Sequence, residues 1–215
     1  MKHFLGISFL IFALPASAMN LPNYKDEMPH NVFPFTPYMG VYTGYGAIDN
    51  MLNGDGQTAI QRLAIGVDSF SWWRVNVGFE LGVQTGNTMR HSSVPLLGDE
   101  PIQLTLKPVL DLLVTARVKP IPCSGTYIFA KGGAAYRRMQ INDRTNIPSL
   151  HKWNGEFQVG AGYEFTPKAR VSAFYQGIFA KDCACVKVNP ITLRGNLKGI
   201  PTQEAAFVGF EYSAL

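Results

Sequence analysis

The sequence is poor in three features that mark common protein classes. Its three cysteines among 215 residues are too few for a disulfide-stapled scaffold. Its basic residues are scattered and interrupted by Asp and Glu, without the Lys/Arg runs that suggest nucleic-acid binding. After the first 18 residues, no apolar segment is long enough for a membrane-spanning helix, and none has a helical period. These absences argue against a disulfide-rich domain, a nucleic-acid partner and a helical membrane protein.

The first 18 residues have the composition of an export signal. Lys2 and His3 precede the apolar run FLGISFLIFAL, and the small residues of the ASA sequence that ends at Ala18 form a cleavage site. The apolar run is too short to span a bilayer as a helix. We therefore predict a secretory signal peptide over residues 1–18, with cleavage after Ala18.

The rest of the chain is rich in two-residue alternation, which is the signal of a β-strand. In EFQVGAGYEFTPKARVSAFYQ (Glu156–Gln176), apolar residues alternate with polar or small ones, and the TPKA break predicts a tight turn between two strands. The same period recurs along the chain and predicts eight strands in all. Besides the two strands of Glu156–Gln176, they are Tyr38–Ala47, Ala59–Val67, Trp73–Gln84, Gln103–Val118, Thr126–Arg138 and Gln203–Tyr212.

The connections between these strands alternate in length. The short ones are Asp68–Trp72, Lys119–Gly125 and Thr166–Ala169, and the long ones are Ile48–Thr58, Thr85–Ile102, Met139–Lys152 and Ala180–Thr202. Short turns at one end and long loops at the other are typical of outer-membrane barrels. Pro108 falls inside the fourth strand, where it cannot donate a ladder hydrogen bond, so we expect a local distortion there.

The polar face of the strands indicates which side meets lipid. A soluble lipid-carrier barrel would place its polar face in water, but glycine weakens a solvated strand and has no use there. The polar face here is rich in glycine, as the crowded interior of a narrow barrel requires. These glycines are Gly40, Gly44, Gly46, Gly66, Gly78, Gly82, Gly133, Gly160, Gly162 and Gly209.

Aromatic residues lie near both ends of the apolar face, as in interfacial girdles. Trp73, Tyr163, Phe165 and Tyr212 are on the turn side, and Tyr45, Tyr136 and Trp153 are on the loop side. We therefore predict an all-β fold, an eight-stranded antiparallel up-and-down transmembrane β-barrel with short periplasmic turns and long extracellular loops. Its predicted divisions are a signal peptide (1–18), an N-terminal periplasmic tail (19–35) and the barrel (36–215).

Several segments resemble the OmpA-like and opacity-type outer-membrane proteins. GAGYEFTPKARVSAFYQ is similar to their sixth strand, turn and seventh strand, FVGFEY to their last strand, and TPYMGVYTGYG to their first. The chain departs from the family in two ways. It continues to Ser213-Ala214-Leu215 where the family ends on an aromatic residue, and it has no peptidoglycan-binding domain. The resemblance implies insertion by the barrel-assembly machinery, but no tether to the cell wall.

Two polar motifs could carry chemistry. His91-Ser92-Ser93 contains a nucleophile beside a base, as in some lipid A-modifying barrels, but it has no acidic partner at fixed spacing. Cys183-Ala184-Cys185 could bind a metal or form a local disulfide, but His30 and His151 are not spaced to complete a zinc site, and Cys123 lies in a turn at the opposite end. We therefore expect no catalytic, cofactor-binding or metal-binding residue.

Charged residues on the inward face predict a closed lumen. They are Arg62, Arg74, Lys107, Arg117, Lys131, Arg137 and Arg170, opposed by Glu80, Asp111, Glu156, Glu164 and Glu211. An eight-stranded barrel is just wide enough for side chains to fill, so enclosed charges must pair. For Arg117, Arg137 and Glu164, a place in water at the barrel mouths is the alternative.

The sequence thus predicts a non-enzymatic protein of the cell outer membrane that supports envelope integrity or surface interaction through its extracellular loops, with a lumen plugged by salt bridges. The alternatives are a narrow pore, a lipid A-modifying enzyme and a soluble lipid carrier. The expected partners are outer-membrane lipid, lipopolysaccharide, the barrel-insertion machinery and a surface or host ligand of the loops. No nucleic acid and no cofactor are expected.

Overall fold

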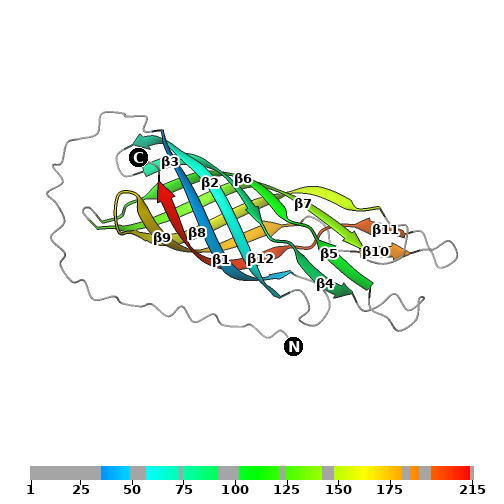
Figure 1. Ribbon diagram of the computed structural model, residues 1–215. Helices are drawn as coiled ribbons and strands as arrows, with labels where there is room; N and C mark the ends of the chain where they lie inside the picture. Colours follow the sequence, from blue (N-terminus) through cyan, green and yellow to red (C-terminus); the bar gives the residue numbers. More distant parts are fainter. Residues whose placement is uncertain are drawn as a thin grey trace.

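The computed structural model describes residues 35–48, 57–72, 75–91, 102–121, 124–141, 148–180, 185–188 and 195–213. Eight long strands form a closed barrel (Figure 1). They are β1 (Thr36–Ile48), β2 (Thr58–Trp72), β3 (Val75–Gln84), β6 (Val109–Val118), β7 (Thr126–Ile141), β8 (Leu150–Glu164), β9 (Ala169–Phe179) and β12 (Gln203–Ser213). No helix in the described ranges is long and apolar enough to cross a membrane.

Each barrel strand pairs antiparallel with the next one in the chain. The ladder runs β1–β2–β3–β6–β7–β8–β9–β12, and β12 returns to pair with β1, for example at Met39 opposite Tyr212. A ring of neighbours leaves no unpaired edge in the barrel wall, which removes the hazard of edge-to-edge association. The predicted eight-stranded antiparallel up-and-down barrel is confirmed.

The two ends of the barrel differ in their connections. The β2–β3, β6–β7 and β8–β9 connections lie at one end, which we call the turn end, together with the start of β1 and the end of β12. The remaining connections lie at the other end, the loop end. Four short strands extend beyond the barrel there (Figure 1). They are β4 (Asn87–His91), β5 (Ile102–Leu106), β10 (Cys185–Val188) and β11 (Gly195–Lys198).

Three of these short strands, β4, β10 and β11, lie within two of the predicted long connections, Thr85–Ile102 and Ala180–Thr202. The β4–β5 pair continues the wall, because β5 pairs with the end of β7, and β10–β11 forms a separate hairpin. The predicted fourth strand is divided in two. Strand β5 ends at Leu106 and β6 begins at Val109, so the distortion expected at Pro108 is confirmed.

The predicted turn at Asp68–Trp72 is wrong. These residues belong to β2, which pairs with β3 as far as Trp72 and contains a bulge between Asp68 and Phe70. Asp and Ser favour turns in isolation. In this barrel, however, the inward periodicity of Arg62 and Ala64 continues to Asp68, which is buried and meets an arginine inside the lumen.

The wall is apolar outside and mixed inside. In β6, Leu110, Leu112 and Val114 are exposed, while the intervening residues from Val109 to Arg117 are buried. Aromatic side chains are exposed near both ends of the outer face, at Tyr163, Phe165 and Tyr212 on the turn side and at Tyr45 and Trp153 on the loop side. Trp73 lies outside the described residues.

Candidate functional site in the barrel lumen

Four charged side chains from four strands meet in the turn-end part of the lumen. Arg117 on β6 contacts Asp68 on β2 (Nη1–Oδ2, 2.8 Å) and Glu211 on β12 (Nη2–Oε2, 3.4 Å). Arg170 on β9 contacts the same two carboxylates, with Nη1 3.6 Å from Asp68 Oδ2 and Nε donating to Glu211. Two arginines and two carboxylates therefore neutralise each other in a buried square.

A second group of four charges lies nearer the middle. Arg62 Nη2 on β2 is 2.6 Å from Asp111 Oδ1 on β6 and 2.9 Å from Glu80 Oε1 on β3. Lys131 Nζ on β7 is 2.7 Å from Glu80 Oε2. The four side chains are at most 1% exposed. We refer to these eight residues, Arg62, Asp68, Glu80, Asp111, Arg117, Lys131, Arg170 and Glu211, as the ionic network.

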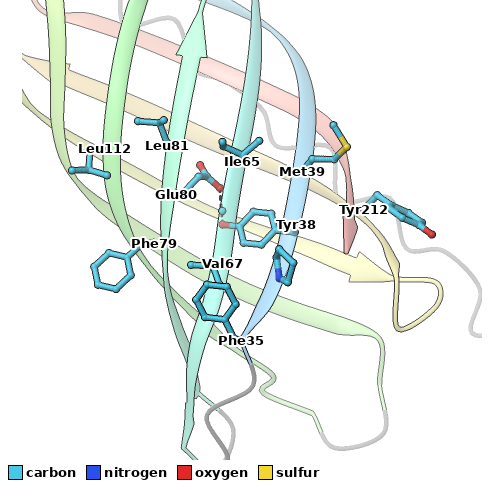
Figure 2. Close-up of a pocket in the computed structure, with 12 residues that line it drawn as sticks. Phe35, Tyr38, Met39, Ile65, Val67, Phe79, Glu80, Leu81, Leu112 and Tyr212 are labelled. Carbon is cyan, nitrogen blue, oxygen red and sulfur yellow. Dashed lines mark hydrogen bonds between the residues drawn. The ribbon is translucent and has the colours of Figure 1, made fainter. Parts of the chain in front are cut away.

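Two tyrosines on β1 connect the two groups of charges. The Tyr38 hydroxyl donates to Glu80 (2.9 Å; Figure 2). The Arg170 guanidinium lies 4.8 Å from the Tyr38 ring centre. The Tyr42 hydroxyl donates to Glu211 (2.8 Å), and its ring lies 5.6 Å from the Lys131 ammonium. Each tyrosine hydroxyl therefore donates to a carboxylate of one group of charges, while the tyrosine ring faces a cation of the other group. The contact between ring and cation is a favourable cation–π arrangement.

The inward glycines make room for these large side chains. A Cβ added at Gly66 would lie 2.4 Å from Cζ of Tyr38, and one at Gly209 would lie 2.3 Å from Cδ1 of Tyr42. Both separations are far inside a van der Waals contact. The glycine-rich polar face thus has a specific cause, because each of these tyrosine rings lies over the neighbouring strand at the point where its directly paired residue is glycine.

The loop-end part of the lumen is filled differently. Seven apolar residues form a buried cluster that we call the apolar cap: Ile48, Leu106, Val109, Ala135, Met139, Ile178 and Ile200. Below it, Glu156 Oε1 accepts hydrogen bonds from Nε2 of Gln158 (2.7 Å) and Nε2 of Gln176 (2.6 Å). Arg137 is buried and donates Nη1 to the Pro201 carbonyl (2.7 Å).

The structure places the predicted lumen charges in three situations. Seven of them, Arg62, Glu80, Asp111, Arg117, Lys131, Arg170 and Glu211, are joined in the ionic network. Arg137 and Glu156 are buried, but neither has an ion pair with another described residue. Glu164 instead pairs with Lys119 at the turn-end mouth, and Lys107 is half-buried at the β5–β6 break. Arg74 lies outside the described residues.

Several lumen residues were missed by the sequence analysis. Asp68 was assigned to a turn, and the inward aromatic side chains of Tyr38, Tyr42, Phe129 and Phe174 were not recognised. The signal was present, because Phe174 has the same two-residue parity as Arg170, Ser172 and Gln176. A search for polar residues alone overlooks the inward aromatic side chains. The mouth alternative is wrong for Arg117 and Arg137, which are 3% and 0% exposed.

The outer wall carries a shallow apolar groove near the turn end (Figure 2). Its outward lining comes from Phe35, Met39, Ile65, Phe79, Leu81, Leu112 and Tyr212, and its volume is about 570 Å³. The Tyr38–Glu80 hydrogen bond lies behind this lining, on the lumen side. At this point the wall separates an apolar exterior from a charged interior by the thickness of one strand layer.

A small polar constellation lies on the outer surface near the loop end. His151 Nδ1 is 2.6 Å from the Tyr136 hydroxyl, and its Nε2 is 3.1 Å from Ser149 Oγ. The Tyr136 ring also packs 5.2 Å from the exposed Trp153. Of the motifs singled out in the sequence, Ser92, Ser93, Cys123 and Cys183 lie outside the described residues, and the side chains of His91 and Cys185 are not described. No group of three His, Cys, Asp or Glu that could hold a metal occurs in the described part.

Solved structures with the same architecture include several small outer-membrane proteins. No protein-family model matches the sequence, and a comparison with curated proteins found no match. The outer membrane protein OprG from Pseudomonas aeruginosa aligns with a TM-score of 0.53 at 12% identity, over 84% of this chain and 97% of that one. Neisserial surface protein A gives 0.50 at 11% identity, over 86% and 99%. Ail, the attachment invasion locus protein of Yersinia pestis, gives 0.50 at 10% identity, over 83% and 97%. The chain therefore has the fold of small outer-membrane β-barrels.

Proposed function

We propose that this protein is a non-enzymatic integral barrel of the cell outer membrane, of the OmpA-like or opacity type, whose lumen is closed. The observation that supports this most directly is the contrast between its two faces. An apolar, aromatic-edged exterior suits lipid, and the eight charges of the ionic network are buried in the interior, where they pair. A water-soluble barrel would place those charges outside.

This proposal includes an export route and a set of partners. Residues 1–18 act as the signal peptide, residues 19–35 form a periplasmic tail, and the barrel-insertion machinery folds residues 36–215 into the membrane. Outer-membrane lipid and lipopolysaccharide contact the wall. The loop end faces outward and supports surface interaction, because recognition residues gather on loops held by a rigid scaffold. The β4–β5 and β10–β11 extensions lie at that end.

The filled lumen supports a plug rather than a pore. The ionic network and the aromatic rings packed against its cations fill the turn-end and middle parts of the lumen, and the apolar cap fills the loop-end part. An ion crossing the barrel would have to disrupt charge pairs that are buried on every side. Removing one partner of such a pair leaves an uncompensated charge, which costs about 3–5 kcal/mol.

Planar-bilayer recording of the pure protein tests this function. We expect at most small and infrequent conductance, together with faster gel migration of the unheated than of the boiled protein, as closed barrels show. Steady, large, ion-selective channels would establish the narrow-pore alternative instead. Folding and solubility without detergent would overturn the membrane location itself.

A second candidate function, hydrolysis of a membrane-lipid ester, rests on the Ser149–His151–Tyr136 constellation. A serine hydroxyl within reach of an oriented histidine is the arrangement of an activated nucleophile, with a phenol in the place of the usual acidic partner. Its position near exposed Trp153 suits a lipid interface. Expression of the wild type should then change the mass of lipid A, and Ser149→Ala should not. Unchanged lipid A in both strains would eliminate this candidate and leave the closed barrel unaffected.

A further inference from the structure

Glu156 differs from every other buried carboxylate in the described part of the chain. Asp68, Glu80, Asp111 and Glu211 each contact a cation, whereas Glu156 is 4% exposed and has no ion pair there. Its Oε1 accepts two amide hydrogen bonds, while its Oε2 is buried without any hydrogen-bond partner. An ionised carboxylate in such a site needs a compensating charge.

The two glutamines that hold Glu156 leave further oxygens without partners. Because an ionised carboxylate only accepts hydrogen bonds, Gln158 and Gln176 must both turn their amide nitrogens toward it. Their carbonyl oxygens are buried and have no donor among the described residues, and the same is true of Gln203 Oε1. Gln158 and Gln176 are directly paired across β8 and β9, and Gln203 pairs with Ile178, the neighbour of Glu156. The unsatisfied atoms of this cluster are therefore all oxygens.

The charge balance of the middle lumen has the sign that such a cluster requires. Glu80 and Asp111 share Arg62, and Lys131 serves Glu80, so these four residues are neutral together. Glu156 adds one further negative charge. It lies beside them because β7 separates it from Asp111 only by the small residues Gly133 and Ala135, which pair with Glu156 and Asp111 respectively.

The remaining buried cation is held elsewhere. Arg137 lies four residues closer to the loop end of β7 than Gly133 and donates to the Pro201 carbonyl. It makes no ion pair with Glu156. One negative charge and a set of buried acceptor oxygens thus remain at the level of Glu156.

We propose that the lumen binds one alkali-metal cation between Glu156 and the amide oxygens of Gln158 and Gln176. Carboxylate and amide carbonyl oxygens are ligands of hard cations, and a single carboxylate matches a single positive charge. The site goes beyond the proposed function and does not depend on it, because a closed barrel in detergent encloses the same residues. Its effect is to give Glu156, the buried carboxylate without an ion pair among the described residues, a positive partner at its own level of the lumen.

The test measures unfolding of the full chain in a neutral detergent, with chelator present, in sodium chloride, potassium chloride or N-methyl-D-glucamine chloride at equal ionic strength. An alkali cation at about a hundred times its Kd should raise the unfolding midpoint by roughly 5–10 °C over N-methyl-D-glucamine. Glu156→Gln should remove this difference. Glu164→Gln, which alters a carboxylate at the turn-end mouth, should keep it.

Equal midpoints of the wild type in all three salts would overturn the proposal and indicate a protonated Glu156 carboxyl or a hydrated cluster. A difference that persists in Glu156→Gln would overturn it by placing the cation elsewhere. In a parallel run without chelator, stabilisation by calcium chloride but by neither alkali salt would overturn the monovalent assignment. If Glu156→Gln does not fold, broadening of the sodium-23 resonance by wild-type protein, reversed by excess potassium, decides the question. Absence of such broadening contradicts the site.

Discussion

The turn-end and loop-end halves of the lumen are built on the same strands but exclude water by opposite chemistry. Strand β6 contributes Arg117 and Asp111 to the ionic network and Val109 to the apolar cap. Strand β9 likewise changes from Arg170 to Ile178 along its length. The inward face of this barrel is therefore not uniformly polar. What its residues share is that they fill a narrow space, and the eight charges of the ionic network pair with one another.

The two halves differ in how strictly they constrain the sequence. Each charge of the ionic network requires partners on other strands at the same level of the barrel. A substitution at one position therefore leaves the charged residues that contact it without a partner. The apolar cap requires only volume and burial, which volume-conserving substitutions can supply. The turn-end half therefore determines which strands face each other across the lumen, while the loop-end half closes the mouth.

The largest effect should follow from removing a shared partner in the ionic network. Glu80→Ala leaves Lys131 without its carboxylate, removes one of two partners of Arg62 and frees the Tyr38 hydroxyl. Because the cations stay buried, we expect a loss of about 3–5 kcal/mol in the free energy of unfolding. Denaturant titration of the protein in detergent measures this loss, and bilayer recording shows whether ions then pass.

A control separates lost charge pairing from lost volume. Glu80→Gln retains the shape and removes only the negative charge, so most of the loss should persist. Stability equal to that of the wild type in both variants would mean that Glu80 is not part of an energetically coupled network.

The outer wall provides the next largest effect. Leu112 is 56% exposed, and its neighbour Leu113 on the lumen face is fully buried. If the exterior faces hydrocarbon, Leu112→Arg should reduce stability in a bilayer by about 2–4 kcal/mol near the midplane. Folding assays in lipid vesicles measure this, with Leu112→Met as the neutral control. Folding of Leu112→Arg into vesicles as readily as wild type would contradict the lipid-facing assignment.

A smaller effect is expected in the apolar cap. Ile178→Val removes one buried methylene from a cluster that is otherwise apolar, which should cost about 0.5–1.5 kcal/mol in unfolding free energy. Conductance should stay at the wild-type level, because the ionic network below still blocks the lumen. Open channels in this variant would show that the apolar cap, and not the ionic network, keeps ions from crossing the barrel.

The fold was predictable from the sequence because two-residue alternation and alternating connection lengths are both local signals. The lumen was predictable only in part. The two-residue alternation of the strands predicts that Arg62, Glu80 and Asp111 face inward. It does not predict which inward residues contact each other, because those contacts depend on how far the strands are staggered around the barrel. The local turn propensity of Asp68 predicts a turn, but its ion pair with Arg117 in the folded barrel outweighs that propensity and keeps Asp68 in the strand.

The cap and the loop-end extensions were missed for a different reason. Val109, Ile178 and Ile200 are apolar, and an apolar residue near a strand end gives no sign of facing inward. Gly199 has a positive φ of 86°, a conformation that favours glycine, just before Ile200 enters the cap. Glycine permits this backbone conformation, but a glycine in the sequence does not by itself predict it.

The smallest effect should occur at the turn-end mouth, where Lys119 Nζ and Glu164 Oε2 are 2.5 Å apart. This pair resembles Lys131–Glu80 in chemistry and differs in exposure, since its side chains are 42% and 20% exposed rather than 1% and 0%. Water and salt can solvate each partner when the other is removed, so Glu164→Gln should change the free energy of unfolding by only about 0–1 kcal/mol. The change should shrink further at high ionic strength, because screening acts on exposed charges more than on buried ones. Denaturant titrations at low and high salt, run beside Glu80→Gln, measure both dependences. A loss at Glu164 as large as that at Glu80 would show that the mouth is as dry as the interior, and the ionic network would then extend to the end of the barrel.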